Sequence, residues 1–64
     1  MIINGKQKDF DSGITVSELL DKLNLDKNKV IVEVNLEIVY KEQLSEYVLN
    51  KDDKIEIISL MGGG

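Results

Sequence analysis

The chain has 64 residues, enough for one domain, and its twelve acidic residues outnumber eight lysines to give a net charge of −4. This charge is unfavourable for binding nucleic acid or an anionic membrane surface, and no apolar run approaches the length of a membrane span. Cysteine and histidine are absent, which excludes disulfides, thiolate catalysis and Cys/His zinc sites. We therefore expect a small protein of the reducing cytoplasm that is not an enzyme.

The first element predicted is a β-hairpin. An apolar run, residues 1–3, is followed by Asn4-Gly5, and this pair suits a two-residue type I′ turn because both positions need a positive φ. The return strand, residues 6–10, is polar except for Phe10. Its lysines discourage pairing with other chains, so we place this strand at a sheet edge.

The next element predicted is a helix that begins at Thr15. Thr15 and Glu18 have the spacing of a capping box, in which each side chain bonds the other residue's backbone N–H. The apolar residues that follow recur at the spacing of one helical face: Val16, Leu19, Leu20 and Leu23. We expect this helix to end near Asn24 and to cover one face of a sheet.

The second half of the chain predicts short extended segments. Residues 30–34 are mostly β-branched and predict a largely buried strand, which a turn at 35–37 connects to an extended piece at 38–40. Residues 41–47 predict a helical turn that points Leu44, Tyr47 and Val48 inward. A polar turn at 50–53 precedes the last strand, residues 54–61, which we place centrally and beside the first strand.

The two faces of the last strand carry different apolar residues. Alternation places Ile55 and Ile57 on one face and Ile58 and Leu60 on the other. If the helix covers one face, one of these pairs faces solvent. Two interpretations stay open: scattered exposed apolar residues, which are common, or an apolar patch for a partner. The elements together predict an α+β fold with a mixed sheet of four to five strands and one helix across one face.

The chain ends in Gly62-Gly63-Gly64, which divides it into a folded domain, residues 1–61, and a flexible tail, residues 62–64. At an average glycine frequency of about 7%, three in a row arise by chance about 3 times in 10,000. An inert end or a cloning remnant is the simplest interpretation. The alternative is a tail that enters a narrow enzyme channel, since glycine lacks a Cβ and allows close backbone approach.

Five segments, taken in order, are similar to one known family: residues 1–6, 15–20, 32–35, 38–44 and 55–64. Together with the length and the terminal Gly63-Gly64, they resemble the ThiS family of sulfur carriers in thiamine (thiazole) biosynthesis. The resemblance covers essentially the whole chain. It implies a ubiquitin-like β-grasp fold and a protein co-substrate, with no cofactor of its own, that is monomeric when free.

The resemblance also implies a chemistry at the C-terminus. A ThiF-like adenylyltransferase uses ATP to adenylate the carboxylate of Gly64. Sulfur from a persulfide, supplied through a cysteine desulfurase, then replaces AMP to form a thiocarboxylate. A ThiG-like thiazole synthase takes that sulfur. On this interpretation Gly62 and Gly63 give access to the partner's channel, and Ile58 and Leu60 form the partner-binding surface.

Three other functions stay open from the sequence. The chain is a sulfur carrier for another product, such as molybdopterin or thiolated tRNA, or it is a ubiquitin-like protein modifier that forms isopeptide bonds with lysines. The third alternative is an interaction module with an inert tail. Loss of Gly64 separates these functions, since it abolishes sulfur transfer and conjugation but leaves simple binding intact.

Overall fold

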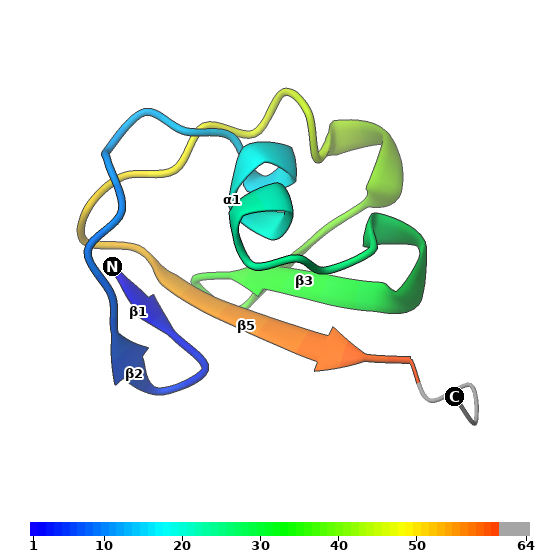
Figure 1. Cartoon of the computed structure of the whole chain (residues 1–64), viewed down its shortest axis with the longest axis horizontal. Helices are drawn as coiled ribbons and strands as arrows, with labels where there is room; N and C mark the ends of the chain where they lie inside the picture. Colours follow the sequence, from blue (N-terminus) through cyan, green and yellow to red (C-terminus); the bar gives the residue numbers. More distant parts are fainter. Residues whose placement is uncertain (61–64) are drawn as a thin grey trace.

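The computed structural model describes residues 1–60, in which one five-stranded sheet carries a single α-helix across one face (Figure 1). The strand order is β2-β1-β5-β3-β4. The regular elements, in chain order, are β1 (Ile2–Ile3), β2 (Lys6–Gln7), α1 (Val16–Lys22), the 3₁₀ turn η1 (Lys27–Lys29), β3 (Val30–Val34), β4 (Glu37–Val39), the 3₁₀ turn η2 (Lys41–Gln43) and β5 (Lys54–Ser59). This α+β arrangement, with its mixed sheet, confirms the predicted fold class.

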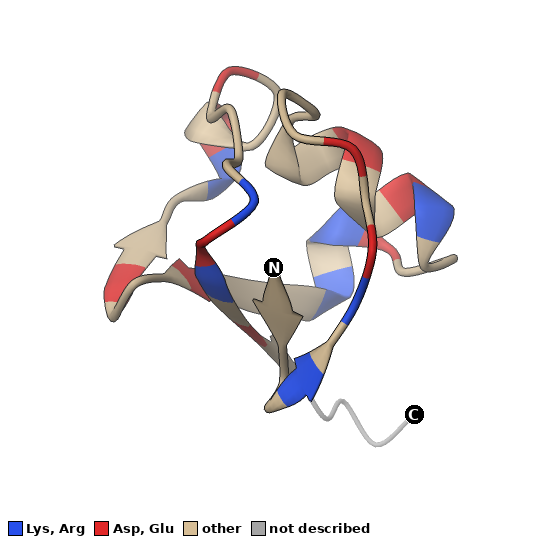
Figure 2. Cartoon of the chain, turned by 90° about the vertical axis from the view of Figure 1, so that its left-hand side faces the viewer, with Lys and Arg blue, Asp and Glu red and all other residues tan. Residues whose placement is uncertain are grey.

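The N-terminal hairpin forms as predicted. Asn4 and Gly5 have φ angles of 50° and 82°, the left-handed conformation that a type I′ turn requires. The return strand β2 lies at the sheet edge and carries lysine there (Figure 2). It spans Lys6–Gln7, shorter than the predicted 6–10, and one further backbone hydrogen bond joins the Lys8 N–H to the Met1 carbonyl at 2.9 Å.

Local sequence signals fix both ends of α1. The hydroxyl of Thr15 accepts a 3.1 Å hydrogen bond from the Glu18 N–H, and the Glu18 carboxylate accepts a 2.8 Å bond from the Thr15 N–H. The predicted capping box is therefore confirmed. After the C-cap at Leu23, Asn24 adopts a φ of 59°. A residue in this left-handed conformation commonly follows the end of a helix.

The core lies between α1 and the inner face of the sheet (Figure 1). The predicted helix face supplies three fully buried side chains, those of Val16, Leu19 and Leu20, with Leu23 partly buried beside them. The buried apolar residues are Met1, Ile3, Val16, Leu19, Leu20, Val32, Val34, Val39, Leu44, Leu49 and Ile55. No helix within residues 1–60 has the length and hydropathy needed to cross a membrane.

Strand β5 is central, as predicted. It runs parallel to β1, with Ile3 beside Ile55, and antiparallel to β3, with Ile31 beside Ile58. The two neighbours hold β5 unequally, because β3 pairs with it over five residues and β1 over two. The second half of β5 therefore lies beyond the end of β1 on one side.

One core prediction after η2 is wrong. Leu44 is buried and Tyr47 is partly buried, as expected, but Val48 is 53% exposed and Leu49 is fully buried. The segment is extended here and not helical: Val48 forms a bridge with Thr15, and the Leu49 N–H donates to Ile14 at 2.8 Å. Consecutive side chains of an extended segment point to opposite sides, so residue 49 and not residue 48 enters the core.

Candidate functional site

The two faces of β5 have the exposures that alternation predicts. Ile55 is fully buried and Ile57 packs partly buried against the core, whereas Ile58 and Leu60 are 48% and 49% exposed. The pair that faces solvent is therefore Ile58 and Leu60, on the side of the sheet away from α1. The exposure of this pair is established, and its use as a partner-binding surface stays a prediction.

Two neighbouring isoleucines extend this apolar surface. Ile31 of β3 lies directly beside Ile58 and is 37% exposed, and Ile38 of β4 is 47% exposed on the same side. We call the surface formed by Ile31, Ile38, Ile58 and Leu60 the open sheet face. It runs across three adjacent strands, β4, β3 and β5.

The sequence prediction missed Ile31 and Ile38. The β-branched run 30–34 predicted a largely buried strand, but only Val32 and Val34 are fully buried. A signal was available in Glu33, because a charged residue inside an apolar run marks the side that faces water. Ile31 is two residues before Glu33 and therefore shares that side.

The open sheet face also carries a pair of like charges. Glu33 of β3 lies directly opposite Glu56 of β5, and both side chains project from the same face as Ile31 and Ile58 because they are two residues from them. Opposite positions on an antiparallel pair bring the Cβ atoms to about 5 Å. The two carboxylates therefore lie beside the apolar residues of this face, and Lys54, two residues before Glu56, projects from the same face.

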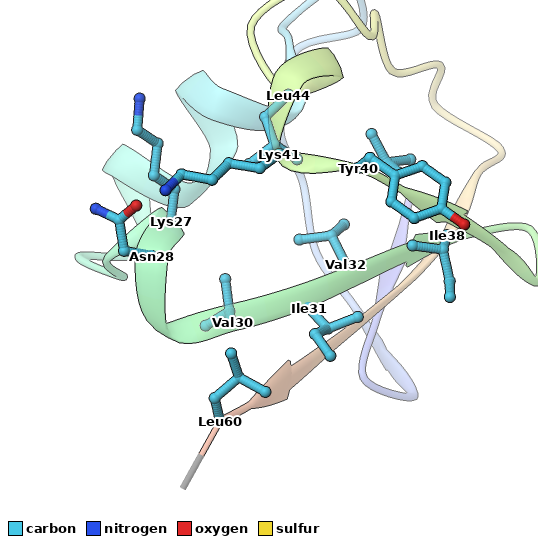
Figure 3. A pocket seen from close by; sticks show the side chains of 11 residues that line it. Lys27, Asn28, Val30, Ile31, Val32, Ile38, Tyr40, Lys41, Leu44 and Leu60 are labelled. Carbon is cyan, nitrogen blue, oxygen red and sulfur yellow. The ribbon is translucent and has the colours of Figure 1, made fainter. Parts of the chain in front are cut away.

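A surface pocket of about 290 Å³ adjoins the open sheet face where β3 and β4 diverge (Figure 3). Ile31, Ile38 and Leu60 of the open sheet face contribute to its walls. Lys27 and Lys41 also line it and extend over one side (Figure 3). The core residues Val32 and Leu44 also line this pocket, so it opens at the edge of β3, and Lys27 and Lys41 lie on the same side of that strand as Val30 and Val32 (Figure 3).

The sheet register continues to the last described residue. The N–H of Leu60 donates a 2.8 Å hydrogen bond to the carbonyl of Lys29, which is the residue immediately before β3 begins. Met61, predicted to end the last strand, and the tail residues Gly62, Gly63 and Gly64 lie outside the described residues. The glycine tail follows Leu60 by one residue in the sequence, so the open sheet face and the tail are adjacent along the chain.

The mixed sheet, the single helix across it and the apolar face at the end of the last strand define a ubiquitin-like β-grasp domain. The sequence model of the ThiS family matches residues 1–64. The chain belongs to the ThiS family.

Two relatives of similar length agree with this assignment. The chain is 42% identical over 64 residues to the sulfur carrier protein ThiS of Bacillus subtilis, and the match covers 97% of this chain and 96% of that protein. Its fold is similar to the crystal structure of the thiamine biosynthesis protein ThiS from Geobacter metallireducens. The TM-score is 0.80 at 32% identity, with 98% of this chain and 96% of the other covered.

Longer relatives contain a similar region. The chain is 44% identical over 64 residues to a thiazole synthase of Paramagnetospirillum magneticum, a match that covers all of this chain and 20% of that protein. A thiazole synthase of Magnetococcus marinus is 36% identical over 62 residues, with 19% of that protein covered. The chain therefore spans about one fifth of the length of these two relatives.

Proposed function

We propose that this protein is a sulfur carrier for the synthesis of the thiamine thiazole, with the carboxyl group of Gly64 as the reacting group. The observation that carries the proposal is the match to the ThiS family over residues 1–64, on a chain whose central strand leads to three glycines. The protein is then a co-substrate, and the catalysts are its partners.

The first step of the proposed reaction activates the carboxylate. A carboxylate oxygen of Gly64 attacks the α-phosphorus of ATP, a P–O bond forms, and the bond to the β-phosphate breaks to release pyrophosphate. The product is an acyl adenylate, a mixed anhydride whose carbonyl carbon is open to nucleophiles. A ThiF-like adenylyltransferase holds the ATP and catalyses this step, so the carrier needs no nucleotide site of its own.

The second step installs sulfur. The terminal sulfur of a persulfide, derived from a cysteine desulfurase, attacks the Gly64 carbonyl carbon and AMP leaves. A thiol then attacks the other sulfur of the resulting acyl disulfide. This releases a thiocarboxylate on Gly64 and leaves a disulfide between that thiol and the donor cysteine. The attacking thiol is oxidised to the disulfide level and the transferred sulfur is reduced from the persulfide to the thiocarboxylate level, so the electrons balance.

The acceptor in this proposal is a ThiG-like thiazole synthase. The proposal is supported by two thiazole synthases that contain a region similar to this chain within proteins about five times as long. When a carrier region and an acceptor enzyme occur in one polypeptide, the covalent linkage raises their effective concentration and favours their binding to each other.

The partner-binding surface in this proposal is the open sheet face. Its four apolar side chains are between 37% and 49% exposed, and its last member, Leu60, is four residues before Gly64. A partner that binds this face is therefore close to the tail. Gly62 and Gly63 complete the proposed site, because a backbone without Cβ atoms passes through a narrow channel.

The proposal is tested by carrier-dependent exchange of labelled pyrophosphate into ATP, with a purified ThiF-like adenylyltransferase. We expect exchange with the intact chain, a large loss of kcat/KM with Gly63→Ala, and none with a chain that lacks Gly64. Because the core described above is built from residues 1–57, we expect circular dichroism and the unfolding midpoint to stay the same in all three proteins. Equal exchange with and without Gly64 would overturn the proposal.

A further inference from the structure

The side chain of Asn4 is hydrogen-bonded to the backbone of the last strand. Its Oδ1 accepts a 2.7 Å bond from the N–H of Ile57, and its Nδ2 donates a 3.3 Å bond to the carbonyl of the same residue. The two residues are 53 positions apart in the sequence. The first turn of the chain is thereby joined to the second half of β5.

These two bonds extend the parallel ladder beyond the end of β1. The Ile2 N–H donates to Asp53 and the Asn4 N–H donates to Ile55. In a parallel ladder that continued, the next bond would run from the Ile57 N–H to the backbone carbonyl of residue 4. At a φ of 50° the chain turns away at Asn4, and the side-chain oxygen takes the place of that carbonyl.

The same substitution occurs on the opposite side of β5. Asn35, also at a left-handed φ of 53°, donates its N–H to the Lys54 carbonyl at 2.8 Å, and its Oδ1 accepts from the Lys54 N–H at 3.0 Å. Asn35 thus stands in for a backbone carbonyl at the start of β5, whereas Asn4 does so in the half that leads to the tail.

We propose that Asn4 is a positioning residue for the sulfur-carrying tail. Its side chain is hydrogen-bonded to Ile57 and so holds the second half of β5 in the sheet, beyond the point where its pairing with β1 ends. This inference rests on the proposed function. Within residues 1–60, no strand pairs with β5 on that side beyond Ile55. Without the amide of Asn4, the segment that contains Ile58 and Leu60 would be hydrogen-bonded on the β3 side alone. This segment immediately precedes the tail.

The position of this contact matters for docking. Ile57 immediately precedes Ile58 of the open sheet face, so a strand end that moves at Ile57 also moves the docking residues and the origin of the tail. A partner must then order this segment when it binds, which weakens binding. The expected consequence is a higher KM for the carrier, with a smaller change in kcat.

The matched variants are Asn4→Gly and Asn35→Gly. Glycine adopts the left-handed φ of both positions without strain, so each change removes a side-chain amide and preserves the turn. Asn4→Asp is the partial variant: it keeps an oxygen for the Ile57 N–H but has no N–H for the Ile57 carbonyl, and aspartate tolerates a left-handed φ.

The first readout is amide hydrogen exchange in the free protein, measured by NMR. One net hydrogen bond corresponds to about a fivefold change in an opening equilibrium. We expect Asn4→Gly to speed exchange at Ile57 by about that factor, with Asn4→Asp between Asn4→Gly and the intact chain. Asn35→Gly should instead speed exchange at Lys54. Unchanged exchange at Ile57 in Asn4→Gly would overturn the inference irrespective of any partner.

The second readout is carrier-dependent pyrophosphate exchange with a purified ThiF-like adenylyltransferase. We expect Asn4→Gly to raise KM for the carrier about five- to tenfold, with less than a twofold change for Asn35→Gly and partial recovery in Asn4→Asp. Equal KM values for Asn4→Gly and Asn35→Gly would show that Asn4 stabilises the fold and does not position the tail. Absence of exchange with the intact chain would refute the proposed function instead, and would leave the result at Ile57 standing.

Discussion

Glu33 of β3 and Glu56 of β5 lie directly opposite each other on the open sheet face. Like charges at opposite positions of an antiparallel pair are destabilising. The sheet nevertheless forms, because Val32 and Val34 on the other side of β3 are buried in the core. The free protein therefore carries a local repulsion that a basic partner surface would relieve, since complementary charge favours association.

The first prediction concerns this pair. Glu56→Gln should raise the free energy of unfolding by about 0.5 kcal/mol, and added salt should reduce the gain because it screens exposed charges. Urea unfolding at low and high salt measures both effects. Glu37→Gln, which changes net charge equally on β4, is the control and should have less effect. A destabilised Glu56→Gln protein would contradict the predicted repulsion.

The second prediction concerns the corrected core residue. Leu49→Ala should cost about 2–5 kcal/mol, because it empties a fully buried site. This is a large part of the roughly 3–10 kcal/mol expected for a domain of this length. Val48→Ala, next in the chain but 53% exposed, should cost far less. Thermal unfolding of the two variants checks the assignment, and equal losses would show that the burial of this segment is wrong.

The third prediction concerns the turn between β3 and β4. Leu36 has a φ of 72° and is 89% exposed, so its side chain gains little from packing while its backbone is strained. Leu36→Gly should stabilise the protein by about 0.5–1 kcal/mol. Leu36→Ala removes the same apolar surface without relieving the strain and should leave stability nearly unchanged. Differential scanning calorimetry separates the two, and a glycine variant that melts below the alanine variant would refute this account of the turn.

The fourth prediction concerns the open sheet face. Ile58→Ser and Leu60→Ser should each lower kcat/KM for adenylation about tenfold or more, since central apolar side chains dominate binding energy at interfaces. Val48→Ser removes an equally exposed side chain from another part of the surface and serves as the control. Comparable rates for all three variants, with folding intact, would exclude the open sheet face as the docking surface.

Local signals made much of the fold predictable. The Asn4-Gly5 turn and the capping box of Thr15 and Glu18 depend on residues within a few positions, and the structure confirms both. The central place of β5 followed from its isoleucines, which need neighbours on both sides. The exposure of Ile58 and Leu60 followed from alternation once one face of β5 was assigned to the core.

The features missed by the sequence analysis depend on distant pairing. Val48 and Leu49 are both apolar, and only the bridge between Val48 and Thr15 determines which of them points inward. Glu33 indicates that Ile31 faces water, but only the pairing of β3 with β5 places Ile31 beside Ile58. The bond from Ile57 to Asn4 spans 53 positions and connects a turn residue to a strand. Periodicity within one segment carries no information about any of these contacts.

The most direct test of the central claim is top-down mass spectrometry of the intact protein after incubation with ATP, a ThiF-like adenylyltransferase and a sulfide source. Replacement of oxygen by sulfur increases the mass by nearly the same amount as oxidation of a methionine, and Met61 immediately precedes the tail in the sequence. The mass gain must therefore be located within residues 62–64 and must require ATP. We predict a thiocarboxylate on Gly64 under these conditions. An unmodified tail after incubation with an adenylyltransferase that activates the Bacillus subtilis ThiS would contradict the assignment of this protein as a sulfur carrier.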